Sequence, residues 1–248
     1  MATQKRTAII NGTPYLFDVG VNAGLDLGNT SKLTVEANFD KKTLPNYQGG
    51  GGDDDVFYRF KEGTVKLECR HISVDLMLVA LGGTAEAVAA GAAEETHTVV
   101  EVGKLIMLDG MQDMSLPLIV TSADGVTTYD EGVHYTRRRV GIVPKALQAG
   151  GIAAGSDVKL SFTQHKHQRV QALVNSITEK GLLFDGINER TGSPWRAKLH
   201  RVGFQPTKTL EFIGDDFLNW SLEGQMLAWD GITDPAKSRF YELLVGDL

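Results

Sequence analysis

The sequence lacks the features that mark secreted, membrane and nucleic-acid-binding proteins. Its single cysteine, Cys69, excludes an internal disulfide framework. No run approaches the roughly 18 consecutive apolar residues that a transmembrane helix needs, and no apolar signal-peptide segment follows the polar start Met1–Arg6. A net charge of −6 provides no basic excess to neutralise phosphates. We therefore expect a protein made in a cytoplasm that contacts no membrane and does not grip nucleic acid.

Proline is also scarce, with 7 residues, whereas glycine reaches 28 residues and punctuates several strand-like runs. Hydrophobic residues make up 42% of the 248 residues, which is enough for a sizeable core. A chain of this length is expected to form one large domain or one domain with an insertion.

Three segments alternate apolar and polar residues with the period of two that is typical of half-buried strands. They are residues 32–39, 64–70 and 218–223. Their apolar faces are predicted to be Leu33, Val35, Ala37 and Phe39, then Val65, Leu67 and Cys69, and then Leu218, Trp220 and Leu222. A fourth candidate strand, residues 195–203, is polar on both sides near its end.

One helix is predicted over residues 74–81. Ser73 is a favourable N-cap, Asp75 suits the first turn, and Gly82 and Gly83 stop the helix. Its residues are apolar nearly all round, so we expect it to be buried against a sheet. The following segment, residues 85–93, is rich in alanine and glutamate and is interpreted as a short helix or a linker.

A glycine-rich loop is predicted between the first two alternating strands. Its four consecutive glycines are costly to order and bury no side chain, so we expect it to be mobile in a free subunit. Its apolar residues suit ordering upon docking to a neighbour. The predicted interface loop consists of Leu44, Pro45, Asn46, Tyr47, Gln48, Gly49, Gly50, Gly51, Gly52, Asp53, Asp54 and Asp55.

A separate small β unit is predicted from the density of turn signals over residues 96–167. The strand-like pattern resumes after this segment, near Val170. The main domain is therefore expected to comprise residues 1–95 and 168–248, interrupted by an insert over residues 96–167.

Residues that could bind a metal or catalyse a reaction occur in the sequence only as isolated groups. His165 and His167 lack a third metal ligand nearby in the sequence. The aspartates of residues 53–55 lack the spaced ligands and closing glutamate of a calcium loop. Adjacent carboxylates at Asp215 and Asp216 diverge on a strand and are better interpreted as a turn after Gly214.

The remaining candidates also favour structural interpretations. Gly150, Gly151 and Gly155 do not join a strand to a helix, so a phosphate loop is not supported. Residues 137–139, three arginines, are interpreted as a solvated face, and Cys69 as an inert buried thiol. We expect no enzyme, no cofactor and no metal.

Three sets of motifs resemble the major tail tube protein of long-tailed, siphovirus-like bacteriophages. The first set is LTVEA (33–37) and KTLPNYQGGGG (42–52), and the second is YDEGVHY (129–135) and GSDVKLSF (155–162). The third and most specific set is LFDGINE (183–189), RVGFQPTKTL (201–210), IGDDF (213–217) and LEG (222–224). Family members more often have aspartate at the position of His134.

This resemblance implies a mainly β, β-rich α+β fold. It comprises a two-sheet antiparallel β-sandwich flanked by a helix, with a small immunoglobulin-like insert that faces outward. Six subunits would form a ring whose inner sheets join into a continuous β-barrel. Stacked rings would form the non-contractile tail tube of a virion, through which the genome leaves.

The resemblance also implies partners. These are other copies of the chain, the tape-measure protein, the tail terminator, the distal tail protein, and double-stranded DNA that passes without specific binding. An acidic chain suits such a conduit because negative walls repel phosphates. Polar strand faces suit a water-filled lumen, and the candidate lumen-facing residues are Lys32, Thr34, Glu36, Asn38, Lys66, Glu68, Arg70, Asn219, Ser221 and Glu223.

Two other classes of function stay open at this point. A secreted or surface β-sandwich adhesin or carbohydrate-binding module would also contain a small β unit, although the absence of a visible signal peptide counts against it. An enzyme such as a glycoside hydrolase has little support from the fragments described above.

Overall fold

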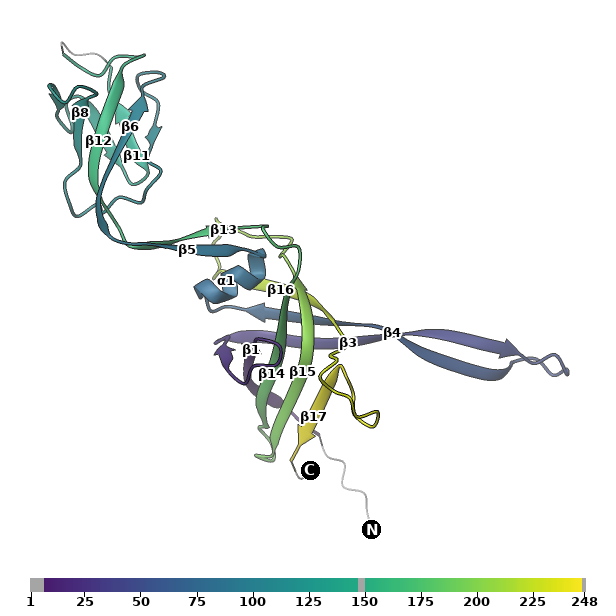
Figure 1. The fold of residues 1–248 in the computed structure, drawn as a ribbon. Helices are drawn as coiled ribbons and strands as arrows, with labels where there is room; N and C mark the ends of the chain where they lie inside the picture. Colours follow the sequence, from purple (N-terminus) through teal and green to yellow (C-terminus); the bar gives the residue numbers. More distant parts are fainter. Residues whose placement is uncertain (1–6, 147–149, 247–248) are drawn as a thin grey trace. The chain divides into compact units, whose positions relative to one another are not determined.

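The computed structural model describes residues 7–146 and 150–246, and it is mainly β, with 52% strand and 3% helix. Antiparallel pairing dominates, as expected. Two compact units are present: residues 1–84 with 170–248 form unit 1, and residues 85–169 form unit 2 (Figure 1). The N-terminal residues 1–6, on which the signal-peptide argument depends, lie outside the described residues.

Eight strands of unit 1 form one continuous sheet rather than the two sheets expected. Its order is β2-β1-β14-β15-β16-β4-β3, with β17 also paired to β15, and no closed barrel occurs among the described residues. The strands are β1 (Ile10–Phe17), β2 (Gly24–Asp26), β3 (Thr30–Pro45), β4 (Asp53–Cys69), β14 (Thr178–Asn188), β15 (Pro194–Gln205), β16 (Trp220–Met226) and β17 (Tyr241–Val245).

Strand β15 joins the two halves of this sheet because it has different partners along its length. Its residues 194–204 pair with β14, while residues 202–205 also pair with β16 and residues 195–199 with β17. Such non-local pairing leaves no trace in the local alternation from which strands are predicted. The local pattern therefore contains no sign that one strand connects the halves.

A β-bulge in β15 explains why this strand reads as polar on both sides. Lys180 lies opposite Val202, but Leu182 lies opposite Leu199, so two steps on β14 face three steps on β15. The extra residue shifts the alternation, so that both Leu199 and Val202 are buried in the same core. His200, next to Leu199, is also buried.

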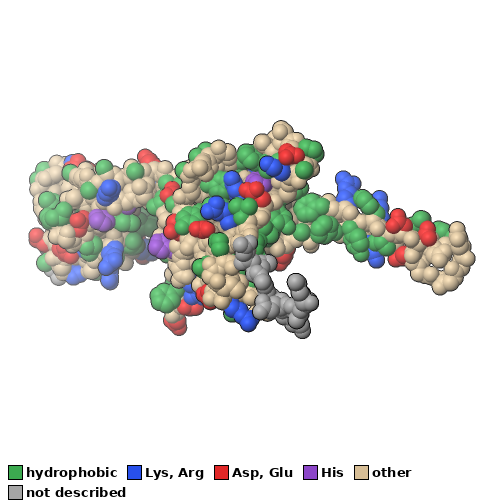
Figure 2. Space-filling model, turned by 90° about the horizontal axis from the view of Figure 1, so that it is seen from below, with side chains coloured by type: hydrophobic (Ala, Val, Ile, Leu, Met, Phe, Trp, Pro, Cys, Tyr) green, Lys and Arg blue, Asp and Glu red, His purple; other side chains and the backbone are tan. Residues whose placement is uncertain are grey.

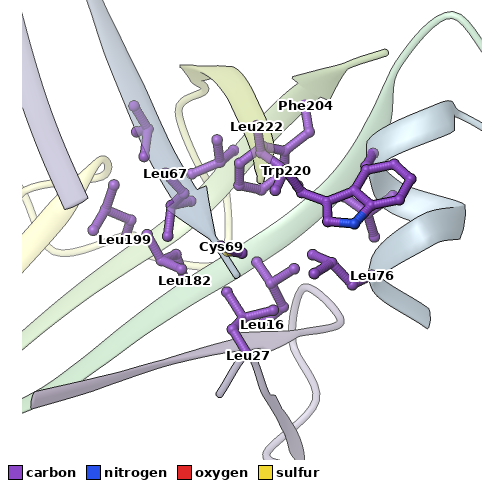
Figure 3. Close-up of a cluster of buried hydrophobic side chains, with 14 of the residues drawn as sticks. Leu16, Leu27, Leu67, Cys69, Leu76, Leu182, Leu199, Phe204, Trp220 and Leu222 are labelled. Atoms are coloured by element: carbon purple, nitrogen blue, oxygen red, sulfur yellow. The ribbon is translucent and has the colours of Figure 1, made fainter. Parts of the chain in front are cut away.

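The only helix in the described residues, α1 (Val74–Leu81), has the predicted bounds and caps. The Ser73 hydroxyl accepts a hydrogen bond from the Leu76 backbone N–H at 3.1 Å, and Gly82 adopts a left-handed conformation with φ of 56°. Leu76, Val79 and Ala80 are buried. Figure 3 shows Leu76 meeting Trp220, Leu16 and Cys69 in the core between the helix and the sheet.

The sheet face predicted for β4 and β16 is confirmed. Val65, Leu67 and Cys69 are fully buried, and Trp220 and Leu222 pack in the same cluster. The prediction for β3 is confirmed only at Leu33, which is partly buried against this core. Residues 35, 37 and 39 of β3 are exposed, because β3 is the edge strand of the sheet and its later residues continue past the core.

The β3–β4 hairpin extends as a two-stranded arm, defined here as residues 39–61 (Figure 1). The predicted 12-residue loop is wrong in extent: Leu44 pairs with Asp55 and Pro45 with Asp53, so only residues 46–52 form the tip. Proline and aspartate, which interrupt most sheets, are accommodated at the free end of a pair with solvent on both faces. Gly49 to Gly52 all have positive φ and make the turn.

Unit 2 consists of two antiparallel sheets over their own core. One has the order β6-β12-β8-β9 and the other β10-β11-β7. The core contains ten buried residues, and the Tyr135 hydroxyl donates to the Leu118 carbonyl oxygen at 3.2 Å. The strands are β6 (Gly91–Thr98), β7 (Ile106–Met107), β8 (Ile119–Ser122), β9 (Thr128–Tyr129), β10 (Tyr135–Arg138), β11 (Gly141–Pro144) and β12 (Asp157–Gln164).

The helix or linker predicted for residues 85–93 is wrong. This segment contains β5 (Thr84–Val88), which pairs with β13 (His167–Gln171), and the start of β6, which pairs with β12. Pairing with distant strands overrides the helix propensity of alanine and glutamate. Unit 2 accordingly begins at Ala85, earlier than the expected residue 96, and ends at Arg169 instead of residue 167.

Candidate functional site

The fragments considered for metal or catalytic chemistry do not come together. No group of three or more His, Cys, Asp or Glu residues that could hold a metal is found in the stretches of the chain that the structure describes. His167 Nδ1 lies 2.8 Å from the backbone oxygen of His165 instead of facing a shared ligand. Cys69 is fully buried, and burial raises the pKa of its thiol, so the reactive thiolate is disfavoured.

The structure does bring together the polar residues of three strands. Residues directly opposite one another in antiparallel strands share a face. The first row across β3, β4 and β16 is Lys32, Glu68 and Ser221, the second is Thr34, Lys66 and Glu223, and the third is Glu36, Thr64 and Gln225. We call these rows the polar face; the core covers its reverse side.

The remaining candidates for the lumen lie at the borders of the polar face. Asn38 is paired with Glu62, where its side-chain Nδ2 donates to Glu62 Oε1 at 3.5 Å. Arg70 directly follows β4, and Asn219 directly precedes β16. All ten predicted residues therefore belong to one region of unit 1, which makes a shared role for them possible.

The ten predicted residues, on the polar face and at its borders, are balanced in charge rather than acidic. The ten predicted residues include three cations (Lys32, Lys66 and Arg70) and three carboxylates (Glu36, Glu68 and Glu223), which sum to zero. Lys66 Nζ lies 3.7 Å from Glu36 Oε2, and Lys208 Nζ lies 3.0 Å from Glu223 Oε2. These pairs are largely solvated, so each contributes little to stability.

The arm exposes apolar side chains on both of its faces. Phe39, Tyr58 and Val56 share one face with Lys41, whereas Phe57 and Leu44 share the other with Lys42. Phe57 and Tyr58 are each 61% exposed. Only the base of the arm is packed, where the Phe60 ring lies 4.8 Å from that of Phe240 and 5.9 Å from that of Phe39, measured between centroids.

The tip of the arm has internal hydrogen bonds. The Asn46 backbone N–H donates to the Gly52 oxygen at 3.0 Å, and the Asn46 side-chain Nδ2 donates to the Gly49 oxygen at 3.1 Å. The Gln48 N–H donates to Asn46 Oδ1 at 2.8 Å. Tyr47 is 84% exposed, so its ring is not covered by apolar side chains of the subunit.

Free strand edges accompany this exposed arm. Strands β2 and β3 end the sheet of unit 1, and β17 pairs on one side only, with β15. Every residue of β17 is exposed, including Tyr241, Leu243 and Leu244. Unpaired backbone groups beside exposed apolar side chains are a template for pairing with another chain.

The sequence interpretation missed some of these residues. Residues 56–58, Val-Phe-Tyr, are three consecutive apolar residues. A strand with one buried face alternates apolar and polar residues, so this run could have indicated an arm with apolar side chains on both faces. Phe212, Ile213 and Phe217 form a second exposed apolar group, which local sequence does not distinguish from core residues. Figure 2 shows apolar side chains following the arm, with basic and acidic groups beside them.

The three arginines of residues 137–139 are predicted to form a solvated face, and this is wrong for the first of them. Arg137 Nη1 donates to the Leu116 oxygen at 2.8 Å, Nη2 to the Asp113 oxygen at 2.9 Å, and Nε to Gln112 Oε1 at 2.8 Å. It therefore ties the segment before β8 to β10. One sequence alone does not distinguish this structural arginine from a solvated one.

Comparisons with known proteins give a family without a function. A family model described as "Protein of unknown function UCP028589" matches residues 8–244. No curated protein matches the chain. In the described residues, no helix is long and apolar enough to cross a membrane.

Proposed function

The chain belongs to this family of unknown function, and we propose that it is a structural virion protein, the subunit of a phage tail tube. Six copies form a ring, and rings stack into the conduit through which the genome is ejected. The protein is made in the host cytoplasm and resides in the virion tail. It has no catalytic role and takes no cofactor.

The observation that carries the proposal is the apolar surface of the arm. Phe39, Phe57, Tyr58 and Tyr47 are exposed on a two-stranded hairpin whose far end touches no other described element. Exposing such side chains to water is unfavourable, and burying one aromatic side chain of this size contributes about 1.5–3 kcal/mol. A second subunit that covers the arm would recover this free energy.

The free edges support closure into a ring. Strand β3 is 16 residues long and is paired on one side only, with β4. Joining the sheets of neighbouring subunits would satisfy these backbone groups and remove the edges. In such a ring the single sheet of unit 1 would serve as the inner sheet of the expected sandwich. The continuous β-barrel would form only when six subunits join their sheets.

The polar face supports a role as the wall of the lumen. It is solvated, lies on one side of a continuous sheet and has no net charge among the predicted residues. A wall of this kind holds water without gripping phosphates, because binding of DNA needs an excess of cations. Unit 2, with its two sheets, is the outward-facing, immunoglobulin-like insert of this proposal.

The further partners follow from the same proposal. The tape-measure protein would occupy the lumen during assembly, and the tail terminator and distal tail protein would bind the two ends of the tube. Double-stranded DNA would pass without specific binding.

The test is the oligomeric state of the purified chain. Native mass measurement is expected to give hexamers, and electron microscopy at increasing concentration is expected to show rings and then tubes of constant bore. Mixing with the proposed tail partners should lower the concentration at which tubes appear. A chain that stays monomeric in all these conditions would contradict the proposal.

One alternative has a specific observation in its favour. Unit 2 is a self-contained two-sheet sandwich, an architecture shared by many adhesins and carbohydrate-binding modules. Glycan-array binding by the monomeric chain, abolished by removing residues 91–164, would favour that function. Tubes that bind no glycan would favour the tail tube.

A further inference from the structure

A short loop of unit 1 exposes apolar and acidic side chains together. Residues 211–217, which we call the acidic loop, lie between Leu210 and Leu218, and both of these leucines pack against the core. Between these anchors Phe212 is 88% exposed, Ile213 96% and Phe217 82%. The loop also holds three carboxylates, Glu211, Asp215 and Asp216.

The acidic loop borders a cleft of about 550 Å³. Phe212 and Phe217 line it together with Glu211, Asp215 and Asp216. Arg70, at the end of β4, also lines it, so its charged lining sums to −2. A cleft that combines phenylalanine rings with carboxylates fits a partner that presents aromatic rings beside cations.

The arm presents this combination. Its shaft, defined as residues 39–43 and 56–61, carries Phe39, Phe57, Tyr58 and Phe60. The shaft also has four cations, Lys41, Lys42, Arg59 and Lys61, and one acid, Asp40, for a net charge of +3. The acidic loop has three acids and no cation, for a net charge of −3.

The charges on both surfaces have no ion-pair partner in the part of the subunit that the structure describes. Among the described residues, the ion pairs within 4.0 Å include none of the four shaft cations and none of the three loop acids. The nearby Lys208 is paired with Glu223 and so is committed elsewhere. Two surfaces of opposite sign and matching apolar content are thus left on one molecule.

The two surfaces lie at opposite ends of one strand pair, so a subunit cannot join them within itself. Strand β4 begins at the arm tip with Asp53 and ends at Cys69, which pairs with Trp220 just after the acidic loop. At roughly 3.3 Å per residue, the 8 to 13 residues between the shaft strand (56–61) and Cys69 span roughly 26–43 Å. A surface at one end that fits a surface at the other makes a head-to-tail contact, which repeats into a stack.

We propose that the shaft of one subunit docks on the acidic loop of a second copy of this chain, in the next ring. The inference rests on the proposed function and specifies the contact that joins the rings. The shaft rather than the tip meets the loop, because the three aspartates at 53–55 have the same sign as the acidic loop. Aromatic rings of the shaft enter the cleft, and the shaft cations pair with its carboxylates.

A charge-swap experiment tests this contact. Lys41→Glu with Lys42→Glu reverses the shaft, and Asp215→Lys with Asp216→Lys reverses the loop. Each double variant is expected to raise the concentration needed for stacking about tenfold at low salt, where charge pairs are least screened. Combining all four substitutions restores opposite signs and is expected to return stacking to within about threefold of the parent chain.

A matched control uses the second pair of adjacent aspartates in the chain. Asp53→Lys with Asp54→Lys makes the same change of net charge, and these residues lie beyond the shaft. Combined with the reversed shaft, this pair restores the net charge without restoring the contact, so stacking should stay impaired. Circular dichroism and thermal unfolding of every variant should match the parent, because all the substituted side chains are exposed.

The outcomes separate this inference from the proposed function. Rescue by the loop pair and not by the control pair supports the contact. Tubes that form normally with either reversed surface, or equal rescue by both pairs, overturn the contact while leaving the tail tube proposal intact. A parent chain that never assembles overturns both.

Discussion

The two halves of the β3–β4 hairpin share the same strands and the same antiparallel pairing, yet one half is core and the other is exposed. In the part of the hairpin outside the arm, which we call the body, Val65 and Leu67 are fully buried in the core. In the arm, Phe57 and Tyr58 on the same strand are mostly exposed. Backbone pairing therefore does not decide burial here; what decides it is whether α1 and the rest of the sheet lie over the strand.

The two halves differ in how many of their faces carry apolar side chains. The body alternates apolar and polar residues because it has one covered face. The arm places apolar residues on both faces, which is a pattern for a strand pair that other molecules surround. We expect substitutions in the body to act on folding and those in the arm to act on assembly.

The largest expected effect comes from removing the arm. Replacing residues 41–58 by Asn-Gly, so that Asp40 and Arg59 flank a two-residue turn, keeps their observed pairing. Stacking is expected to be lost completely, while the midpoint of thermal unfolding stays close to that of the parent. Sedimentation and electron microscopy measure the first, and calorimetry the second. Unfolding of the shortened chain would show that the arm supports its own subunit.

Single substitutions at a buried and an exposed position of β4 are expected to have smaller effects than removal of the arm. Leu67→Ala leaves a cavity in a fully buried site and is expected to lower the free energy of unfolding by about 2–5 kcal/mol. Phe57→Ala, at an exposed site on the same strand, should change it by less than about 0.5 kcal/mol and weaken stacking instead. All three tryptophans, Trp195, Trp220 and Trp229, belong to unit 1, so their fluorescence reports its unfolding.

Acid should destabilise the body and leave the arm unaffected. His200 is buried and its ring stacks on Trp229 with centroids 5.7 Å apart. Burial lowers the pKa of His200, because the charged imidazolium is poorly solvated there. The unfolded chain then binds a proton that the folded chain does not, so stability falls as the pH drops below about 6.5 and levels off below the lowered pKa.

Urea unfolding followed by tryptophan fluorescence at a series of pH values measures this effect. His200→Gln removes the titrating group and should flatten the profile between neutral pH and the lowered pKa of His200. Equal profiles for the parent and His200→Gln would contradict the assignment.

A small effect on folding is also expected at the polar face. Glu36→Lys removes a half-exposed pair with Lys66 and should change the free energy of unfolding by no more than about 1 kcal/mol. In an assembled tube it should slow DNA ejection at low salt, because each subunit then adds cations that attract phosphates. Unchanged ejection kinetics in tails built from this variant would place Glu36 outside the lumen.

Local features of unit 1 were predictable from the sequence, and non-local ones were not. The caps of α1 and the buried face of β4 depend on residues within one segment, so Ser73, Gly82 and Leu67 could be interpreted directly. The outer end of the arm resembles a loop because Pro45 and the glycines that follow it are typical of loops. Only the pairing of Leu44 with Asp55 shows that the strands continue.

The candidate surfaces divide in the same way. The polar rows follow from alternation in each strand, but their alignment across β3, β4 and β16 depends on register, which alternation does not specify. In the acidic loop, the adjacent carboxylates were recognisable and were interpreted as a turn. Phe212 and Phe217 are exposed because no other segment of the subunit covers them. Local sequence patterns do not specify whether a distant segment covers a residue.

The bulge in β15 predicts where evolution can change the length of this chain. Deleting either His200 or Arg201 would restore two-for-two pairing with β14 and leave Leu199 and Val202 two residues apart on the same face, so residues 194–199 would keep their facing. Loss of one residue should therefore be tolerated at this position among descendants of the same gene, whereas a one-residue change elsewhere in β15 would turn part of the strand over. At the tip, residues 46–52, a change of length costs little, so gaps in a family alignment should collect there.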